Sequence, residues 1–239
     1  MFPENISHFE QLMLSRFAQS EMTDKLHSYT LPYRELMAYY RCAIMEVETK
    51  FRVLSEEFSL EYDHNPIETI KSRLKSPESI MNKMTTRGYP LSVASIEQNL
   101  HDVAGIRVIC DFTSSIYMLR DAFLKQDDIT LVEEKDYIKN PKDNGYRSLH
   151  LIVEVPIFLH DSKRKMKVEV QLRTIAMDWW ASSEHKIRYK KELPKAGEID
   201  EMLKECASIS ADLDDRMENI RQLAEQYAQS PEEEEPARD

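Results

Sequence analysis

The sequence predicts an α+β fold: a mixed, mainly antiparallel sheet of about five strands packed by helices, with long helices at the N- and C-terminal ends. Strand-like apolar runs gather in the middle of the chain, at residues 103–112, 129–138, 146–155 and 166–173. Helix-period runs flank them, at residues 5–60 and 198–228. With 41% hydrophobic residues over 239 positions, the chain can bury a core beneath such a sheet.

The N-terminal half supplies most of the expected helices. The pair Asn65 and Pro66 is expected to open a short helix containing the segment KSRLKS, because Asn caps helices and Pro is tolerated at their first position. A second helix restarts at Ser76 and Pro77 and ends at Gly88. In that helix one polar stripe is formed by residues four apart, Ser79, Lys83 and Arg87. Further helices are expected at residues 92–101 and 116–125.

Two more helices are expected after the last strand. Residues 175–191 form the first, with Trp179 and Trp180 in the core. The second carries apolar residues seven apart and therefore needs a packing partner, either the N-terminal helices or another subunit. Residues 230–239, with four consecutive Glu, are expected to be a disordered acidic tail.

Composition limits the classes of protein to consider. No run approaches the roughly 20 apolar residues of a membrane span, and the N-terminus lacks the features of a signal peptide. The cysteines Cys42, Cys110 and Cys206 form neither a pair motif nor a metal-binding spacing, which indicates a reduced, cytoplasmic protein. The net charge of −11 argues against DNA binding. Lys and Arg nevertheless outnumber Asp and Glu in residues 63–191, which suits a small polyanion.

Residues 135–150, KDYIKNPKDNGYRSLH, carry the strongest signal for a binding site. Pro, Asn, Asp and Gly place a tight loop between two strands. Tyr146 and His150 then share one face of the following strand. An aromatic ring for stacking a base, beside cations for phosphates, indicates a nucleotide site, although a solvated hairpin can have the same composition. The strand 166–173 returns a polar face, Glu169, Gln171 and Arg173.

The chemistry of phosphate binding has to come from side chains. Neither GxxxxGK[ST] nor GxGxxG is present. Suitable cations are Arg73, Lys75, Lys83, Arg87, Lys135, Lys142 and Arg147. Asp102 and Glu169, at strand positions beside cations, could hold Mg²⁺ or could form two salt bridges. Arg107 interrupts an apolar strand and must face an edge, a carboxylate or a ligand.

Five segments, in order, resemble the synthetase domain of the RelA/SpoT proteins: RLKSPES (73–79), DVAGIRV (102–108), KDYI..PK.NGYRSLH (135–150), VEVQLRT (168–174) and AMDWWASSEHK (176–186). Without room for a hydrolase or regulatory domain, the chain resembles a stand-alone small alarmone synthetase, nearer the RelP than the RelQ type. The resemblance implies a nucleotidyltransferase-like fold and a homotetramer. The expected parts are a helical scaffold (1–62), a catalytic domain (63–191), a C-terminal helix (192–229) and the acidic tail.

The resemblance implies transfer of the ATP pyrophosphate to the ribose 3′-hydroxyl of GDP or GTP, giving AMP and ppGpp or pppGpp in stringent-response signalling. Asp102 and Glu169 would hold Mg²⁺, and Glu169 would also activate the 3′-hydroxyl. Arg73 and Arg107 would enclose adenine, and the remaining ATP-side residues would be Lys75, Ser79, Lys83 and Arg87. Tyr146 would stack on guanine, and the other guanine-side residues would be Lys135, Lys142, Asn144, Arg147, His150 and Gln171.

The alternative is a non-catalytic regulatory module that binds guanine nucleotide or RNA. Asp102 and Glu169 separate the two hypotheses, because a pure binder has no need to place carboxylates beside its own cations. Nucleotidyl transfer would call for a paired Asp-x-Asp at a strand end, which the sequence lacks. No membrane partner is expected.

Overall fold

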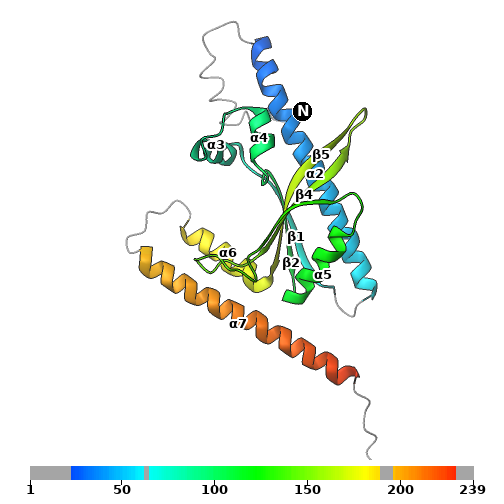
Figure 1. Cartoon of the computed structure of the whole chain (residues 1–239), viewed down its shortest axis with the longest axis vertical. Helices are drawn as coiled ribbons and strands as arrows, with labels where there is room; N and C mark the ends of the chain where they lie inside the picture. Colours follow the sequence, from blue (N-terminus) through cyan, green and yellow to red (C-terminus); the bar gives the residue numbers. More distant parts are fainter. Residues whose placement is uncertain (1–22, 62–64, 189–195, 230–239) are drawn as a thin grey trace, which may run out of the picture.

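The protein folds into a five-stranded sheet flanked by helices (Figure 1). The computed structural model describes residues 23–61, 65–188 and 196–229, so the first part of the predicted N-terminal helix and the predicted acidic tail lie outside the described residues. The helices are α2 (Thr23–Glu61), α3 (Pro77–Thr86), α4 (Val93–Asn99), α5 (Thr113–Leu124), α6 (Ile175–Arg188) and α7 (Ala196–Gln229). The strands are β1 (Ile67–Leu74), β2 (Ala104–Cys110), β3 (Thr130–Asp136), β4 (Leu149–Phe158) and β5 (Lys163–Thr174).

The strands lie in the order β1-β2-β5-β4-β3, which makes β5 the central strand. The β2–β5 pair is parallel, and the other three pairs are antiparallel. The predicted α+β class with a mixed, mainly antiparallel sheet is therefore confirmed.

Strand β1 corrects one expectation, because the segment after Asn65 and Pro66 is not a helix. The Asn65 side chain accepts a hydrogen bond from the Ile67 backbone nitrogen at 2.9 Å, which closes a local turn rather than a helix cap. The chain then runs extended and pairs antiparallel with β2 over its whole length. Asn suits both local structures, and pairing with the edge of β2 decides between them. With β1 included, the sheet has five strands.

One face of the sheet is covered by the core helices. Helix α2 contacts β1, β2, β4 and β5, and α5 contacts β2 and β5. Phe51 of α2 stacks on Phe123 of α5, with their ring centroids 4.5 Å apart. Alternate residues of the central strands are fully buried beneath them, among them Val168, Val170 and Leu172. Since successive strand residues point to opposite faces, the polar residues between these positions lie on the other face.

Helices α6 and α7 pack on each other at one end of the sheet (Figure 1). Trp180 is buried, and its indole nitrogen donates a hydrogen bond to the Leu203 carbonyl at 2.9 Å. Trp179 is 60% exposed, so the expectation that both tryptophans are core residues is wrong for Trp179. Neighbouring helix positions point about 100° apart, and α7 covers only one side of α6.

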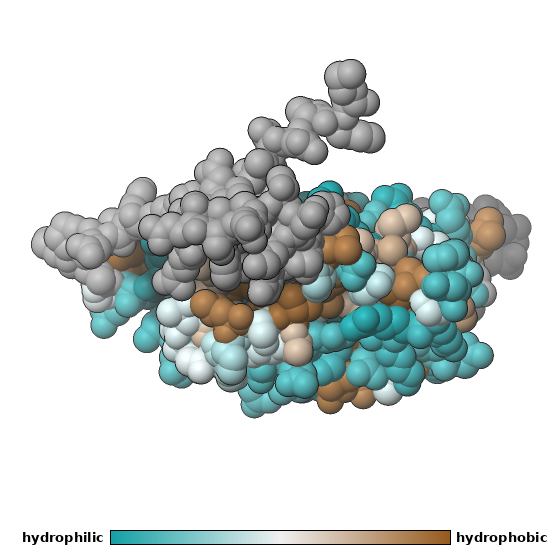
Figure 2. All heavy atoms as spheres, turned by 90° about the horizontal axis from the view of Figure 1, so that it is seen from above, coloured by the Kyte–Doolittle hydropathy of each residue, from teal (hydrophilic) through white to brown (hydrophobic). Residues whose placement is uncertain are grey.

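The exposed surface is mainly hydrophilic, in agreement with the charged composition of the chain. Hydrophilic residues predominate on the described part of the face that Figure 2 shows, with hydrophobic residues in small groups between them. Among the described helices, none has an apolar stretch long enough to cross a membrane. Cys42, Cys110 and Cys206 are all free.

Candidate functional site

Two rows of side chains cross the polar face of the sheet. Directly paired residues of neighbouring strands point to the same face, so the strand register gives the composition of each row. The first row contains, from β1 to β3, Lys71, Arg107, Gln171, His150 and Lys135. The second contains, in the same order, Arg73, Gly105, Glu169, Ile152 and Glu133. Six residues expected in the site, contributed by all five strands, thus lie on one surface.

The β1–β2 end of these rows contains the two arginines expected to enclose adenine. Gly105 lies between them, and a Cβ atom added there would lie 3.4 Å from the Arg73 Cγ, so this glycine lets Arg73 lie close over β2. Arg107 donates from Nη1 to Asp178 at 3.1 Å. Its Nε is buried and has no hydrogen-bond partner among the described residues. A cavity of about 160 Å³ is lined by Arg73, Gly105 and Arg107 together with Glu169 and Gln171.

Next to this cavity, two ammonium groups meet one carboxylate. Lys75 follows β1, and Lys83 lies on α3. Their Nζ atoms donate to the same Oδ2 of Asp102, at 2.6 and 2.7 Å. Ser79 and Arg87 are exposed on the same helical stripe as Lys83, with Ile80 and Met84 buried on the other side of α3, as the spacing predicts. These cations can therefore gather around a polyphosphate.

Asp102 and Glu169 are both ionised at neutral pH. Burial raises the pKa of Asp102, but the hydrogen bonds from Lys75 and Lys83 lower it more, and the net pKa lies below the ordinary value. Burial likewise raises the pKa of Glu169, and the neighbouring His150 and Gln171 lower it to a net value below the ordinary one. The negative charge of Asp102 raises the pKa of Glu169, against the effect of His150 and Gln171.

The carboxylate pair fits a hard cation with several ligands of its own. Asp102 Oδ1 is buried and has no hydrogen-bond partner among the described residues. Among the described residues, no three or more His, Cys, Asp or Glu side chains are grouped so that they could hold a metal ion. Magnesium typically takes one or two carboxylates and completes its shell with substrate phosphates and water, which is the donor set available here.

The β4–β3 end of the rows contains a chain of polar contacts that reaches Glu169. The Tyr146 hydroxyl lies 2.7 Å from His150 Nε2. His150 Nδ1 lies 3.5 Å from Glu169 Oε1, and Gln171 donates from Nε2 to Glu169 Oε2 at 2.8 Å. The aromatic ring and the central carboxylate are thereby held in a fixed relation.

The loop of residues 142–147 presents Tyr146. Asn144 accepts a hydrogen bond from the Tyr146 backbone nitrogen at 3.2 Å, and Gly145 takes the positive φ of 87° that the tight turn requires. Lys142 Nζ lies 4.9 Å from the centroid of the Tyr146 ring, so a cation now covers that ring. Arg147 is directed elsewhere: its Nη1 donates to Asp214 of α7 at 3.3 Å. Lys135 is half exposed beside Glu133, 3.0 Å away.

Arg173 is a residue that sequence reasoning placed on the polar face without a role. It is 4% exposed and donates hydrogen bonds to the Tyr146 hydroxyl at 2.5 Å, to Gln171 at 2.9 Å and to Asp178 at 3.2 Å. Since Asp178 also binds Arg107, the Arg173–Asp178 pair joins the two ends of the rows. The available signal was an arginine on the polar strand face, five residues before an acid in the first turn of the next helix.

Replacement of Arg173 by Lys is expected to lower the free energy of unfolding by about 1–3 kcal/mol, because a single ammonium cannot reach all the groups that the guanidinium fork joins. Arg164→Lys on the same strand is the matched control and should change little, since Arg164 pairs with Glu97 at the surface. Denaturant titration measures both. Equal stability of the two variants would contradict the proposed role of Arg173.

Comparisons with known proteins identify a family, relatives and solved structures that are similar to this chain. Residues 72–193 match the model of the region found in RelA / SpoT proteins. The GTP pyrophosphokinase YwaC of Bacillus subtilis (strain 168) is 43% identical over 200 residues, which are 83% of this chain and 94% of that relative. The crystal structure of small alarmone synthetase 1 from Bacillus subtilis bound to its product pppGpp is similar with a TM-score of 0.73 at 32% identity, over 79% of this chain and 96% of that one. The AMPCPP-bound structure of the same synthetase gives a TM-score of 0.70 at 29% identity, over 81% and 98%.

Proposed function

The chain belongs to the RelA/SpoT family, and we propose on that basis that it is a (p)ppGpp synthetase. It is a GTP pyrophosphokinase, which transfers the β,γ-pyrophosphate of ATP to the ribose 3′-hydroxyl of GDP or GTP and releases AMP with ppGpp or pppGpp. The observation that carries this proposal is the position of Glu169 on the central strand, between the arginines of β1 and β2 and the Tyr146–His150 pair. Residues 63–191 form the catalytic domain. The assignment to the RelP type stays a prediction.

ATP binds at the β1–β2 end of the rows. The guanidinium groups of Arg73 and Arg107 enclose the adenine, since arginine stacks on flat aromatic rings. An ammonium group has three donors, so Lys75 and Lys83 can hold Asp102 and still donate to phosphate oxygens. Ser79 and Arg87 on the same stripe of α3 complete this ATP-side group. The AMPCPP complex of the related synthetase supports a donor site in this fold.

GDP or GTP binds at the β4–β3 end. Its guanine stacks on Tyr146 once Lys142 moves off the ring and turns to the phosphates. Lys135, Asn144, His150 and Gln171 orient the ribose and phosphates, and Arg147, which is bound to Asp214 of α7, belongs to the same guanine-side group through the loop that carries Tyr146. The related synthetase binds pppGpp, a guanine nucleotide, which supports a guanine-nucleotide site in this fold.

Glu169 removes the proton as the new bond forms. The 3′-oxygen attacks the β-phosphorus of ATP, the bond between that phosphorus and the oxygen bridging to the α-phosphate breaks, and AMP leaves. A carboxylate with a lowered pKa stays ionised until the hydroxyl becomes acidic in the transition state, and it takes the proton then. The contacts of Glu169 with His150 and Gln171 fix its direction, which matters because this chemistry depends on in-line positioning.

Asp102 and Glu169 are the residues that would hold Mg²⁺. Asp102 offers its buried Oδ1, which has no partner within the described part of the chain, and both carboxylates are ionised. When bound, the ion neutralises charge on the transferred pyrophosphate. Because both substrates are cytoplasmic nucleotides, we place the reaction in the cytoplasm.

A nucleotide assay tests the proposed function. The purified chain is incubated with Mg²⁺, GDP or GTP, and ATP labelled on the γ-phosphate, and the nucleotides are separated by chromatography. Label in a guanosine tetra- or pentaphosphate, with an equal amount of AMP, is expected. Tight binding of guanine nucleotide without any transfer would instead support the non-catalytic regulatory module.

Replacement of Tyr146 by Ala is expected to raise the KM for GDP about 5- to 150-fold, the loss expected when one base stacks on one ring. The KM for ATP should stay within about twofold, because the ATP-side residues lie on or next to β1, β2 and α3, away from the loop that carries Tyr146. Tyr146→Phe is the control that keeps the ring and removes the hydroxyl contacts with His150 and Arg173. A similar KM increase for both nucleotides would argue against stacking on Tyr146.

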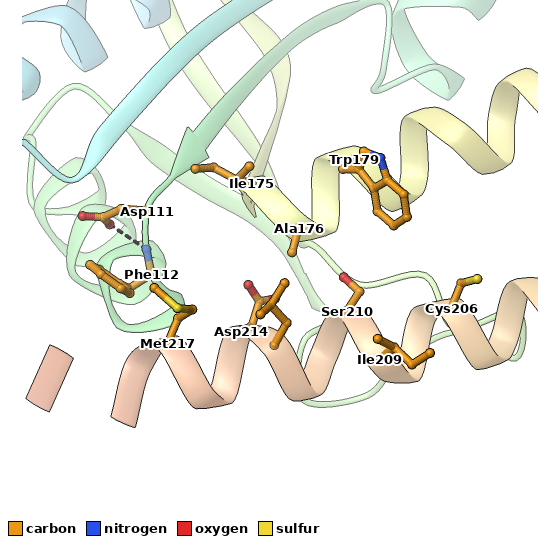
Figure 3. Close-up of a pocket in the computed structure, with 11 residues that line it drawn as sticks. Asp111, Phe112, Ile175, Ala176, Trp179, Cys206, Ile209, Ser210, Asp214 and Met217 are labelled. Carbon is orange, nitrogen blue, oxygen red and sulfur yellow. Dashed lines mark hydrogen bonds between the residues drawn. The ribbon is translucent and has the colours of Figure 1, made fainter. Parts of the chain in front are cut away.

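We also propose that the enzyme is a homo-oligomer, a homotetramer, assembled through the groove between α6 and α7. This groove has a volume of about 680 Å³ (Figure 3). It is lined by exposed apolar side chains, among them Trp179, Ile209 and Leu213. Exposed apolar residues continue along α7 as Met217, Ile220, Leu223 and Tyr227, and such a stripe on a long helix needs a partner.

Leu213→Glu places a charge in the middle of this stripe and is expected to dissociate the tetramer. The mass in solution should then fall below four times the 28.1 kDa of the chain. Light scattering coupled to size-exclusion chromatography measures the mass. Arg216→Gln, on the exposed side of the same helix, is the control that changes the net charge by the same single unit. A monomeric native chain would refute the assembly.

A further inference from the structure

The backbone of the 142–147 loop rests directly on α7. A Cβ atom added to Gly145 would lie 2.5 Å from the Cβ of Ala207, closer than real Cβ contacts come. Lys204, one turn earlier on the same helix, lies 3.8 Å away by its Cα. The loop that carries Tyr146 therefore has no free space behind its turn, and α7 fixes how far the turn can move back.

Two helical turns beyond Ala207, α7 makes a second contact with the same loop. Asp214 is 8% exposed, and its Oδ2 accepts hydrogen bonds from Arg147 Nη1 at 3.3 Å and from the Thr174 hydroxyl at 3.0 Å. Thr174 ends β5 and also accepts a hydrogen bond from the Met177 backbone nitrogen at 3.1 Å in the first turn of α6. One carboxylate thus joins α7, the loop and the end of the strand that carries Glu169.

A contribution to stability does not by itself explain why a carboxylate is buried at position 214. Burial raises the pKa of Asp214, and the contacts with Thr174 and Arg147 only partly counter that effect. Buried ion pairs add little net stability compared with apolar residues of similar size, and most of the neighbouring α7 positions that line the groove, such as Ile209, Leu213 and Met217, are apolar. The Arg147–Asp214 pair instead provides a directed link between α7 and the loop.

We infer that Asp214 is a positioning residue for the guanine nucleotide: through Arg147, and with Ala207 behind Gly145, it holds the 142–147 loop in the geometry that presents Tyr146. The inference rests on the proposed function and deepens it. It assigns a role in substrate binding to α7, which lies beyond residues 72–193 that match the family model. It also gives Arg147 a role through the loop rather than by direct contact with phosphate.

Steady-state kinetics of Asp214→Asn test the inference. The amide keeps the shape of the carboxylate and loses its charge, so the KM for GDP and GTP is expected to rise about tenfold, with the KM for ATP within about twofold. Asp215→Asn removes the same charge at the next, exposed position of α7 and should leave every constant unchanged. A general loss of structure would instead move both KM values and the thermal midpoint.

A second pair of variants separates positioning from direct contact. If Arg147 acts through Asp214, the Arg147→Met and Asp214→Asn double variant should have the same KM for GDP as the worse single variant, because both changes break one link. Additive losses would mean that Arg147 binds the nucleotide itself and would overturn the inference. Ala207→Gly tests the other contact by opening space behind Gly145, and it should raise the same KM without adding a clash.

The proposed function and the positioning role of Asp214 would be refuted by different results. A native chain that makes no product refutes the proposed function. A native chain that makes product, with an Asp214→Asn variant that matches Asp215→Asn in its KM for GDP, refutes only the role of Asp214.

Discussion

Replacement of Glu169 by Gln is expected to slow pyrophosphate transfer about 10³-fold while the chain stays folded and binds both nucleotides. The amide has the same shape, but its single oxygen can keep only one of the two contacts that the carboxylate oxygens make with His150 and Gln171, and it cannot accept the proton of the 3′-hydroxyl. It also removes one of the two charges that would hold Mg²⁺. Single-turnover transfer of labelled pyrophosphate measures the loss, and nucleotide titration measures binding.

The matched control is Glu154→Gln on β4. Glu154 lies opposite Lys167 in the register of β4 and β5 and is partly exposed, so its replacement removes one charge at a position outside the two rows. That variant should retain transfer. Transfer by the Glu169→Gln variant at more than about a tenth of the native rate would contradict the role of Glu169 as the base.

Replacement of Asp102 by Asn is expected to lower kcat/KM for ATP by about 10²-fold and to shift the Mg²⁺ requirement to higher concentration. The amide would place two ammonium groups, from Lys75 and Lys83, beside a neutral side chain. It would also weaken the buried Oδ1, which no described residue contacts by a hydrogen bond. The rate as a function of Mg²⁺ concentration, at fixed ATP and GDP, measures both effects.

Asp161→Asn is the control for charge alone, because Asp161 is exposed beside His160 between β4 and β5. It should leave the Mg²⁺ dependence unchanged. If Asp102→Asn lowers the rate but leaves the Mg²⁺ midpoint where it was, Asp102 only holds the two lysines, and the metal is bound without it.

Much of the candidate site could be predicted from the sequence, because its residues lie in short polar segments at strand spacing. The polar stripe of α3 and the polar face of β5 follow from the period of a helix and of a strand. The rows across the sheet could not be predicted, since they depend on which strands are neighbours. The parallel pairing of β2 with the distant β5 sets Arg107 beside Gln171, and no local pattern encodes it.

The missed features share one cause, which is that tertiary partners decide them. β1 looked like a helix because Asn65 suits a turn as well as a cap, and only the edge of β2 selects the strand. Arg173 has no visible role until α6 brings Asp178 to it. The link between Arg147 and Asp214 joins residues 67 positions apart, on elements that the sequence could not place side by side.

A crystal structure of the chain with Mg²⁺, GDP and a non-hydrolysable ATP analogue tests the central claim most directly. The account predicts the adenine between Arg73 and Arg107, the guanine on Tyr146, and the ribose 3′-oxygen within hydrogen-bond distance of Glu169. A nucleotide bound away from the two rows, for example in the groove between α6 and α7, or a 3′-oxygen facing away from Glu169, would contradict it.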